Sequence, residues 1–188
     1  DLRRGMTVKP TFHENVTLFF SDVVGFTTIC DQVEPSDVIS MMNQLYSVMD
    51  FLASHFGLYK VETVGDAYLC ASGVPEPDEL HAEKIANFAL AVVECVKHVK
   101  SPIDGSPIEL RIGIHTGSCT SGVVGTLTPH YCLFGDTVNT TSRHESTGMA
   151  GKIQCSSMMF GRLQHFSKAE TSQYNFRARG LVDMKGKG

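Results

Sequence analysis

The segment LYKVETVGDAYLCAS, residues 58–72, sets the frame for the fold. Its two halves, residues 58–64 and 67–72, are rich in β-branched, aromatic and other apolar residues, which is typical of strands. The pair Gly65-Asp66 between them suits the tight turn of a hairpin. The segment therefore predicts two neighbouring antiparallel strands with Asp66 at the tip of their connection.

Apolar residues at helical spacing occur on both sides of this hairpin. On its N-terminal side they recur every three or four positions over residues 38–52, after a proline at position 35 that suits the first turn of a helix. On its C-terminal side residues 79–99 show the same spacing. The sequence therefore predicts one long amphipathic helix before the hairpin and a second one after it.

Two further strands complete the expected core. Residues 16–20 form a short apolar run, and residues 108–115 alternate apolar and polar side chains. The order of elements is then βαββαβ, which is the ferredoxin-like arrangement of an antiparallel sheet with both helices on one face. We expect a fold of the α+β class.

The rest of the chain predicts a C-terminal βαβ extension of this core, followed by smaller elements. The expected elements are a strand at 131–134, a helix at 137–147, a strand at 152–155, a short helix at 157–163 and a closing hairpin near 175–185. Cys119 and Ser121 lie beside two glycines, and a glycine-bounded turn between strands is the expectation for them.

Composition predicts a single domain over residues 1–188. With 42% hydrophobic and 19% charged residues the chain can bury a core, and its net charge of −4 leaves no broad basic surface for nucleic acid. No apolar run reaches the roughly 18 residues of a membrane span, so no direct membrane contact is expected. The six scattered cysteines suggest reduced thiols in the cytoplasm. A soluble protein and the cytosolic end of a membrane receptor both fit this expectation. The chain starts without Met, and we expect a piece of a longer protein whose C-terminal end is truncated.

Two aspartates are candidates for metal binding. Asp22 follows the first strand and Asp66 sits at the hairpin tip, so their carboxylates would meet if the two strands are neighbours. Mg²⁺ favours one or two carboxylates together with substrate phosphates. Aspartates are also common in turns, and position alone leaves that interpretation open.

Five motifs, in the same order along the chain, resemble the class III adenylyl and guanylyl cyclase domain. They are FSDVVGFTT (20–28), VETVGDAY (61–68), RIGIHTG (111–117), YCLFGDTVN (131–139) and MKGKG (184–188). The resemblance covers nearly the whole chain. It implies a head-to-tail dimer with active sites in the groove between subunits, and two Mg²⁺ or Mn²⁺ ions per site held by Asp22, Val23 and Asp66.

The same resemblance implies roles for four polar residues. Arg111 would hold the phosphates of the nucleotide from the subunit that binds the metals. Asn139 and Arg143 would act catalytically from the partner subunit, orienting the ribose and stabilising charge on the α-phosphate, and Lys185 would contact the phosphates from that subunit. Without the resemblance, a surface ion pair of Arg111 and a solvated helix face at positions 139 and 143 are the plain alternatives.

Glu62 and Cys132 match the positions that read the base. Guanine offers donors at N1 and N2 and an acceptor at O6, which a carboxylate and a weakly donating thiol complement. The family's guanylyl cyclases typically carry Glu and Cys there, whereas its adenylyl cyclases typically carry Lys and Asp. The resemblance therefore favours GTP as the substrate.

The expected reaction is conversion of GTP to 3′,5′-cyclic GMP and pyrophosphate, by attack of the ribose 3′ oxygen on the α-phosphate. Because the chain carries both halves of the site, a homodimer is expected and a heterodimer is open. The alternatives are an adenylyl cyclase and a catalytically silent partner that needs a different chain. The group that takes the 3′ proton is undecided among Asp22, water and a substrate phosphate.

Overall fold

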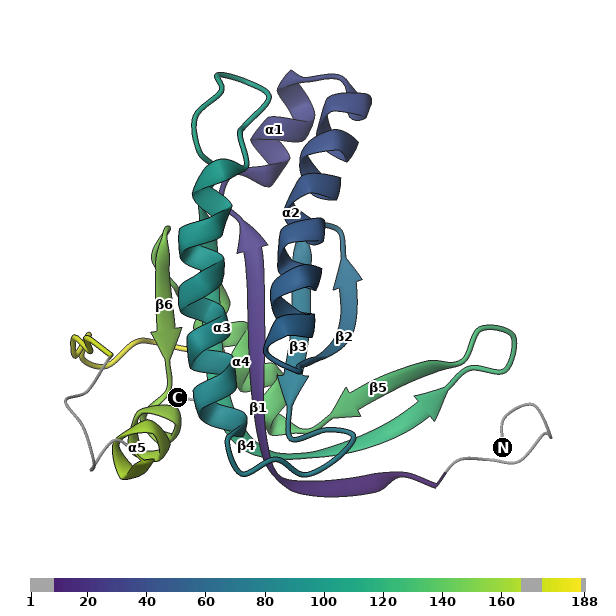
Figure 1. Cartoon of the computed structure of the whole chain (residues 1–188), viewed down its shortest axis with the longest axis vertical. Helices are drawn as coiled ribbons and strands as arrows, with labels where there is room; N and C mark the ends of the chain where they lie inside the picture. The colour runs from purple at the N-terminus through teal and green to yellow at the C-terminus, as the bar shows by residue number, and fades with distance from the viewer. Residues whose placement is uncertain (1–8, 167–173, 187–188) are drawn as a thin grey trace.

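The first apolar run of the chain forms the middle strand of a five-stranded path through a mixed sheet. The computed structural model describes residues 9–166 and 174–186 (Figure 1). The elements are β1 (Thr11–Val23), α1 (Phe26–Gln32), α2 (Pro35–His55), β2 (Tyr59–Val64), β3 (Ala67–Ser72), α3 (His81–Cys95), the 3₁₀ turn η2 (Val96–His98), β4 (Leu110–Val124), β5 (His130–Phe134), α4 (Asp136–Ser146), β6 (Lys152–Cys155) and α5 (Ser157–Phe166).

The strand order is β2-β3-β1-β4-β5, with β6 pairing to β4 outside this path. β1 is antiparallel to both of its neighbours, so that Ser21 lies opposite Tyr68 of β3 and Asp22 lies opposite Arg111 of β4. Residues 120–124 of β4 pair with β5, and residues 111–114 of β4 pair in parallel with β6. The expected βαββαβ core and its βαβ extension, formed by β5, α4 and β6, are therefore confirmed.

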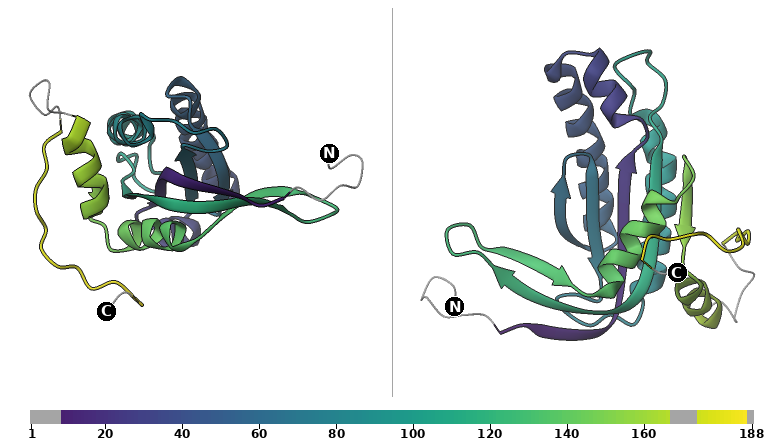
Figure 2. Two further views of the ribbon diagram at one scale, coloured as in Figure 1. Left: turned by 90° about the horizontal axis from the view of Figure 1, so that it is seen from below. Right: turned by 180° about the vertical axis from the view of Figure 1, so that it is seen from behind.

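Helices cover both faces of the sheet. α2 and α3 lie on one face and α4 lies on the other (Figure 2). The apolar stripes of α2 and α3 enter one core with the inward side chains of β1 and β3, which include Phe19 and Tyr68. Burying such a side chain contributes about 1.5–3 kcal/mol relative to leaving it exposed. The helical spacing of apolar residues thus decides which side of each helix meets the sheet.

A glycine in β4 lets α4 approach the sheet closely. A Cβ atom added to Gly113 would lie 2.6 Å from the carbonyl oxygen of Thr141 and would also clash with the backbone nitrogen of Glu145. Atoms at such separations overlap, so the backbone of α4 can rest on β4 only where a side chain is missing. This close approach seats α4 directly on β4.

The structure corrects two sequence expectations. Cys119 and Ser121 lie inside β4, paired with β1, and not in a turn, because strand pairing on both sides overrides the flanking glycines. The described residues 174–186 contain no strand, so the closing hairpin near 175–185 is wrong. The short helix α1 was not expected. Within the described ranges no helix is long and apolar enough to cross a bilayer.

Candidate active site

The two candidate metal carboxylates meet at one end of the sheet. β1 and β3 are direct neighbours, and the turn after β2 therefore folds back beside the end of β1. The backbone N–H of Val23 donates to Oδ2 of Asp66 at 3.0 Å, which places this carboxylate next to the residue that follows Asp22. The Gly65-Asp66 turn places Asp66 at the tip of the hairpin, and the pairing of β1 with β3 brings that tip to the end of β1.

These residues suit a hard divalent cation. The chemistry of the donors is all oxygen, from the carboxylates of Asp22 and Asp66 and from the main chain at Val23. In the described part of the chain no group of three or more His, Cys, Asp or Glu residues has the geometry to hold a metal. Two carboxylates leave coordination positions for phosphate oxygens and water, which is the way Mg²⁺ is usually bound.

Arg111 lies directly beside this pair. Its guanidinium binds Asp22 with two contacts, Nε to Oδ1 at 3.1 Å and Nη2 to Oδ2 at 2.6 Å. The two side chains are 35% and 22% exposed, so the pair is open to solvent and to a ligand. The hydrogen bond to Asp22 raises the pKa of Arg111 further, and the guanidinium remains a fixed positive charge at the edge of the site.

Glu145 is a site residue that the sequence did not reveal. It is only 6% exposed, and its Oε1 lies 3.4 Å from Nε of Arg111. Burial, followed by a hydrogen bond with Asp22, raises the pKa of Glu145 to about 8. Burial of this carboxyl group therefore favours its protonated form. Glu145 is four residues after Thr141, which also faces the sheet. This spacing was the one sequence feature that could have predicted which way the Glu145 side chain points.

The opposite side of α4 carries a second polar group. Asn139 is exposed and Arg143 is half-buried one helical turn later, so the two share one face. The C-terminal segment returns to this face, because a Cβ atom on Gly186 would lie 3.4 Å from Nη2 of Arg143. Lys185, next to that glycine, is exposed and comes to the same region. Three of the predicted residues are thus gathered here.

The two predicted base-reading residues lie on β2 and β5. Glu62 is exposed on the edge strand β2, and Cys132 is half-buried on β5. The rings of Tyr59 and Tyr131 join these strands edge to face, with centroids 5.2 Å apart. The thiol of Cys132 donates only a weak hydrogen bond, 3.7 Å to the carbonyl oxygen of His130. A better acceptor could replace that bond.

Comparison with known proteins identifies the family of this chain. Residues 8–188 match the family model described as the adenylate and guanylate cyclase catalytic domain. The chain belongs to this family. The class III cyclase resemblance and the fold class expected from the sequence are both confirmed by this match and by the solved structures described next.

Three relatives of this cyclase domain illustrate the likeness. It is 46% identical to rat guanylate cyclase soluble subunit beta-2 over 187 residues, which are 100% of the chain and 26% of that protein. It is 44% identical to human retinal guanylyl cyclase 1, again over the whole chain but over 17% of that protein. The guanylate cyclase domain of RhGC from Catenaria anguillulae, solved in complex with GTP, superposes with a TM-score of 0.85 at 42% identity, covering 95% of this chain and 93% of that one. The chain thus spans about a quarter or less of these two full-length relatives.

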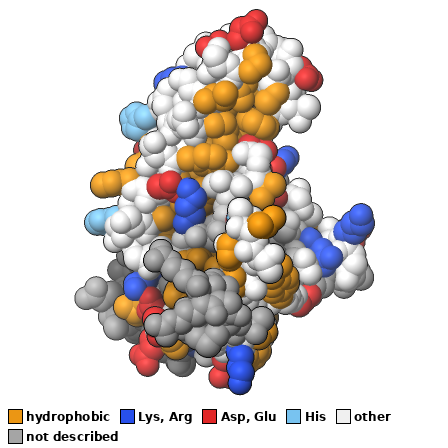
Figure 3. Space-filling view, turned by 90° about the vertical axis from the view of Figure 1, so that its right-hand side faces the viewer, with side chains coloured by type: hydrophobic (Ala, Val, Ile, Leu, Met, Phe, Trp, Pro, Cys, Tyr) orange, Lys and Arg blue, Asp and Glu red, His pale blue; other side chains and the backbone are white. Residues whose placement is uncertain are grey.

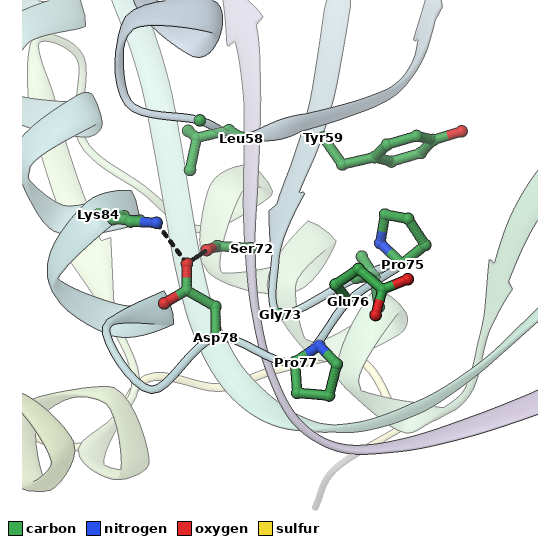
Figure 4. Close-up of a pocket in the computed structure, with 11 residues that line it drawn as sticks. Leu58, Tyr59, Ser72, Gly73, Pro75, Glu76, Pro77, Asp78 and Lys84 are labelled. Atoms are coloured by element: carbon green, nitrogen blue, oxygen red, sulfur yellow. Dashed lines mark hydrogen bonds and ion pairs between the residues drawn. The ribbon is translucent and has the colours of Figure 1, made fainter.

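The domain also has a hollow of about 440 Å³ (Figure 4), which lies apart from the residues predicted to bind metal, phosphate and base. It opens between the start of β2, the end of β3 and the start of α3, and Lys84 binds Asp78 across its wall at 2.6 Å. None of the predicted site residues lines it.

Proposed function

We propose that this domain converts GTP to 3′,5′-cyclic GMP and pyrophosphate in a groove between two copies of the chain. The observation that carries this proposal is that Asp66 accepts a hydrogen bond from Val23 at the end of β1, next to Asp22 and its partner Arg111. Such a group of residues would combine a divalent-cation site with a cation that binds phosphate. The relatives named as guanylate cyclases and the GTP complex of the fungal domain support the substrate.

Two Mg²⁺ or Mn²⁺ ions would be held by Asp22, Asp66 and the main chain at Val23. When bound, such ions lower the pKa of the ribose 3′ hydroxyl and neutralise the triphosphate. Arg111 would turn from Asp22 towards the phosphates, since a guanidinium binds phosphate oxygens in the same two-pronged manner. The protein then contributes mainly positioning and charge, as in other phosphoryl transfers.

The face of α4 with Asn139 and Arg143 supplies the complementary half of the site. Both side chains project from one face of a helix whose backbone rests on β4, which would help to preorganise them as donors. Asn139 would orient the ribose, and Arg143 would stabilise the charge that develops on the α-phosphate, with Lys185 beside it. Removing one preorganised donor of this kind typically raises a reaction barrier by about 3–4 kcal/mol.

A homodimer would complete both sites. In one chain Glu145 binds Arg111 from the sheet-facing side of α4, while Asn139 and Arg143 point about 120° and 160° away from it around the helix axis. The second group therefore faces away from the chain's own metal side. A band of apolar side chains runs along the side of the molecule that carries α2 and β2 (Figure 3). Exposed apolar patches mark protein interfaces, and Val64 is 64% exposed and Phe134 is 52% exposed.

The test of this proposal is an assay of the purified domain with GTP and with ATP, in Mg²⁺ or Mn²⁺, at several protein concentrations. We expect cyclic GMP from GTP, at least about tenfold less product from ATP, and specific activity that rises with concentration as dimers form. Preference for ATP would make the domain an adenylyl cyclase. No product from either nucleotide, in a folded dimer, would favour the silent partner of a different chain.

The pairing of Glu62 and Cys132 with guanine predicts a change of substrate. The double substitution Glu62→Lys with Cys132→Asp should lower kcat/KM for GTP by at least about tenfold and raise it for ATP, because an unpaired buried polar group costs roughly 1–3 kcal/mol. The ratio of the two kcat/KM values is the measurement. An unchanged ratio in a folded double variant would remove these two residues from base recognition.

A further inference from the structure

The hairpin that carries Asp66 has few supports of its own. β2 is at the edge of the sheet within the described chain, and its pairing with β3 is irregular between Lys60 and Glu62. Residues 62–65 are exposed, and Gly65 adopts a left-handed conformation with φ of 61°. Edge strands with bulges and exposed turns open easily, so the position of the Asp66 carboxylate depends on contacts made at the turn.

Two hydrogen bonds hold this turn from opposite sides. On one side Asp66 accepts from the Val23 N–H of β1 at 3.0 Å. On the other side the hydroxyl of Tyr46, from helix α2, donates to the carbonyl oxygen of Gly65 at 2.6 Å. That carbonyl belongs to the peptide group that joins Gly65 to Asp66. The hydroxyl therefore restrains the rotation that would swing the carboxylate away from Asp22.

Tyr46 is itself held in place by a cluster of α2 and the hairpin strands. Asp50, one helical turn further along α2, accepts from the Tyr68 hydroxyl at 2.8 Å and binds Nζ of Lys60 at 2.7 Å. The Tyr46 ring lies 6.0 Å from the Tyr68 ring, and Nζ of Lys60 lies 5.8 Å from its centroid. Burial and the charges of Asp66 and Asp50 raise the pKa of Tyr46, so the hydroxyl keeps its proton and remains a donor.

We propose that Tyr46 is a positioning residue that holds the Gly65-Asp66 peptide group, and thereby the Asp66 carboxylate, in the geometry needed to bind a divalent cation. The inference rests on the proposed function for the metal-binding role of Asp66. The hydrogen bond itself acts in the protein without metal or nucleotide. Removal of the hydroxyl leaves the ring and its packing, so Tyr46→Phe changes this one contact.

Tyr68→Phe is the matched control. It also removes one tyrosine hydroxyl from the same cluster, but that hydroxyl donates to Asp50 of α2 and not to the turn. The Tyr68 hydroxyl is the more buried of the two, so Tyr68→Phe should lose at least as much stability in thermal unfolding as Tyr46→Phe. Only Tyr46→Phe should loosen the turn.

Amide hydrogen exchange in the metal-free protein gives the first measurement. We expect exchange over residues 64–67 to be about five- to tenfold faster in Tyr46→Phe, and unchanged in Tyr68→Phe. The second measurement is binding of Mn²⁺, followed by its electron paramagnetic resonance signal, in the presence of guanosine α,β-methylene triphosphate. The Mn²⁺ concentration for half-saturation should rise about tenfold in Tyr46→Phe alone.

Unchanged exchange in Tyr46→Phe, or equal changes in both variants, would overturn the positioning role. Unchanged Mn²⁺ binding in a variant with faster exchange would overturn its link to the metal. Failure of the proposed function would appear differently. The wild-type domain would then form no cyclic GMP, while amide exchange over residues 64–67 would still be faster in Tyr46→Phe than in the wild type.

Discussion

Asp22→Asn and Asp66→Asn should each reduce cyclic GMP formation by at least about 100-fold at every metal concentration, while the domain remains folded. Asparagine keeps the shape of the side chain and removes its charge. At position 66 the amide oxygen can still accept the Val23 N–H, so the turn keeps its hydrogen bond. At position 22 the substitution removes the ion pair with Arg111. This pair is partly exposed, so its loss should change the stability of the domain little.

The measurement is initial rate against Mg²⁺ and Mn²⁺ concentration, with thermal unfolding of each variant. Asp31→Asn, an exposed change on α1, is the control and should match the wild type. Its unfolding free energy should stay within about 0.5 kcal/mol, as for most surface substitutions. Near-normal product from Asp22→Asn or Asp66→Asn would end the metal assignment.

Mixing two inactive variants should restore about a quarter of the wild-type activity per protein, as two-fold symmetry requires. The first variant carries Asp22→Asn with Asp66→Asn and keeps the α4 face. The second carries Asn139→Ala with Arg143→Ala and keeps the metal side. In a mixed dimer one groove joins the intact metal side of the second variant to the intact helix face of the first, and the other groove is broken twice.

Random pairing makes about half of the dimers mixed, and each has one good site of two, which gives the quarter. Co-expression with two different tags allows the mixed dimers to be isolated and assayed separately. The isolated species should then show about half of the wild-type rate. If mixed dimers are recovered but stay inactive, each site is built within one subunit and the shared groove is wrong.

The fold could be predicted because its deciding signals are local, whereas the candidate site residues were predicted from the motifs that resemble the cyclase family. The strand and turn signals of the hairpin place Asp66, and its pairing with β1 brings it to Asp22. Helical periodicity places Asn139 and Arg143 on one face. The structure adds the arrangement of these groups in space, while their roles in catalysis stay predictions.

The contacts that sequence could not supply depend on how elements cross. Glu145 meets Arg111 only because α4 rests on β4 at Gly113, and nothing near residue 145 in the chain records that crossing. The glycines after Cys119 favour a turn locally, but strand pairing on both sides overrides them. Tyr46 gave no signal because its partner is a main-chain carbonyl 19 residues away.

The seating of α4 on the sheet has a thermodynamic consequence for the proposed dimer. On one side of this helix Glu145 contacts the Arg111 guanidinium and the Asp22 carboxylate of its own chain. The other side of the helix would face the nucleotide bound by the metal-binding residues of the second chain. Its backbone rests on β4 without an intervening side chain, so the two sides move as one body. Any shift of α4 caused by ligand in one groove is then felt in the other, and linkage makes that coupling reciprocal. Cooperativity between the two nucleotides would thus depend on how rigidly α4 is seated on β4, at Gly113 and at Gly117, where Thr137 of α4 lies close.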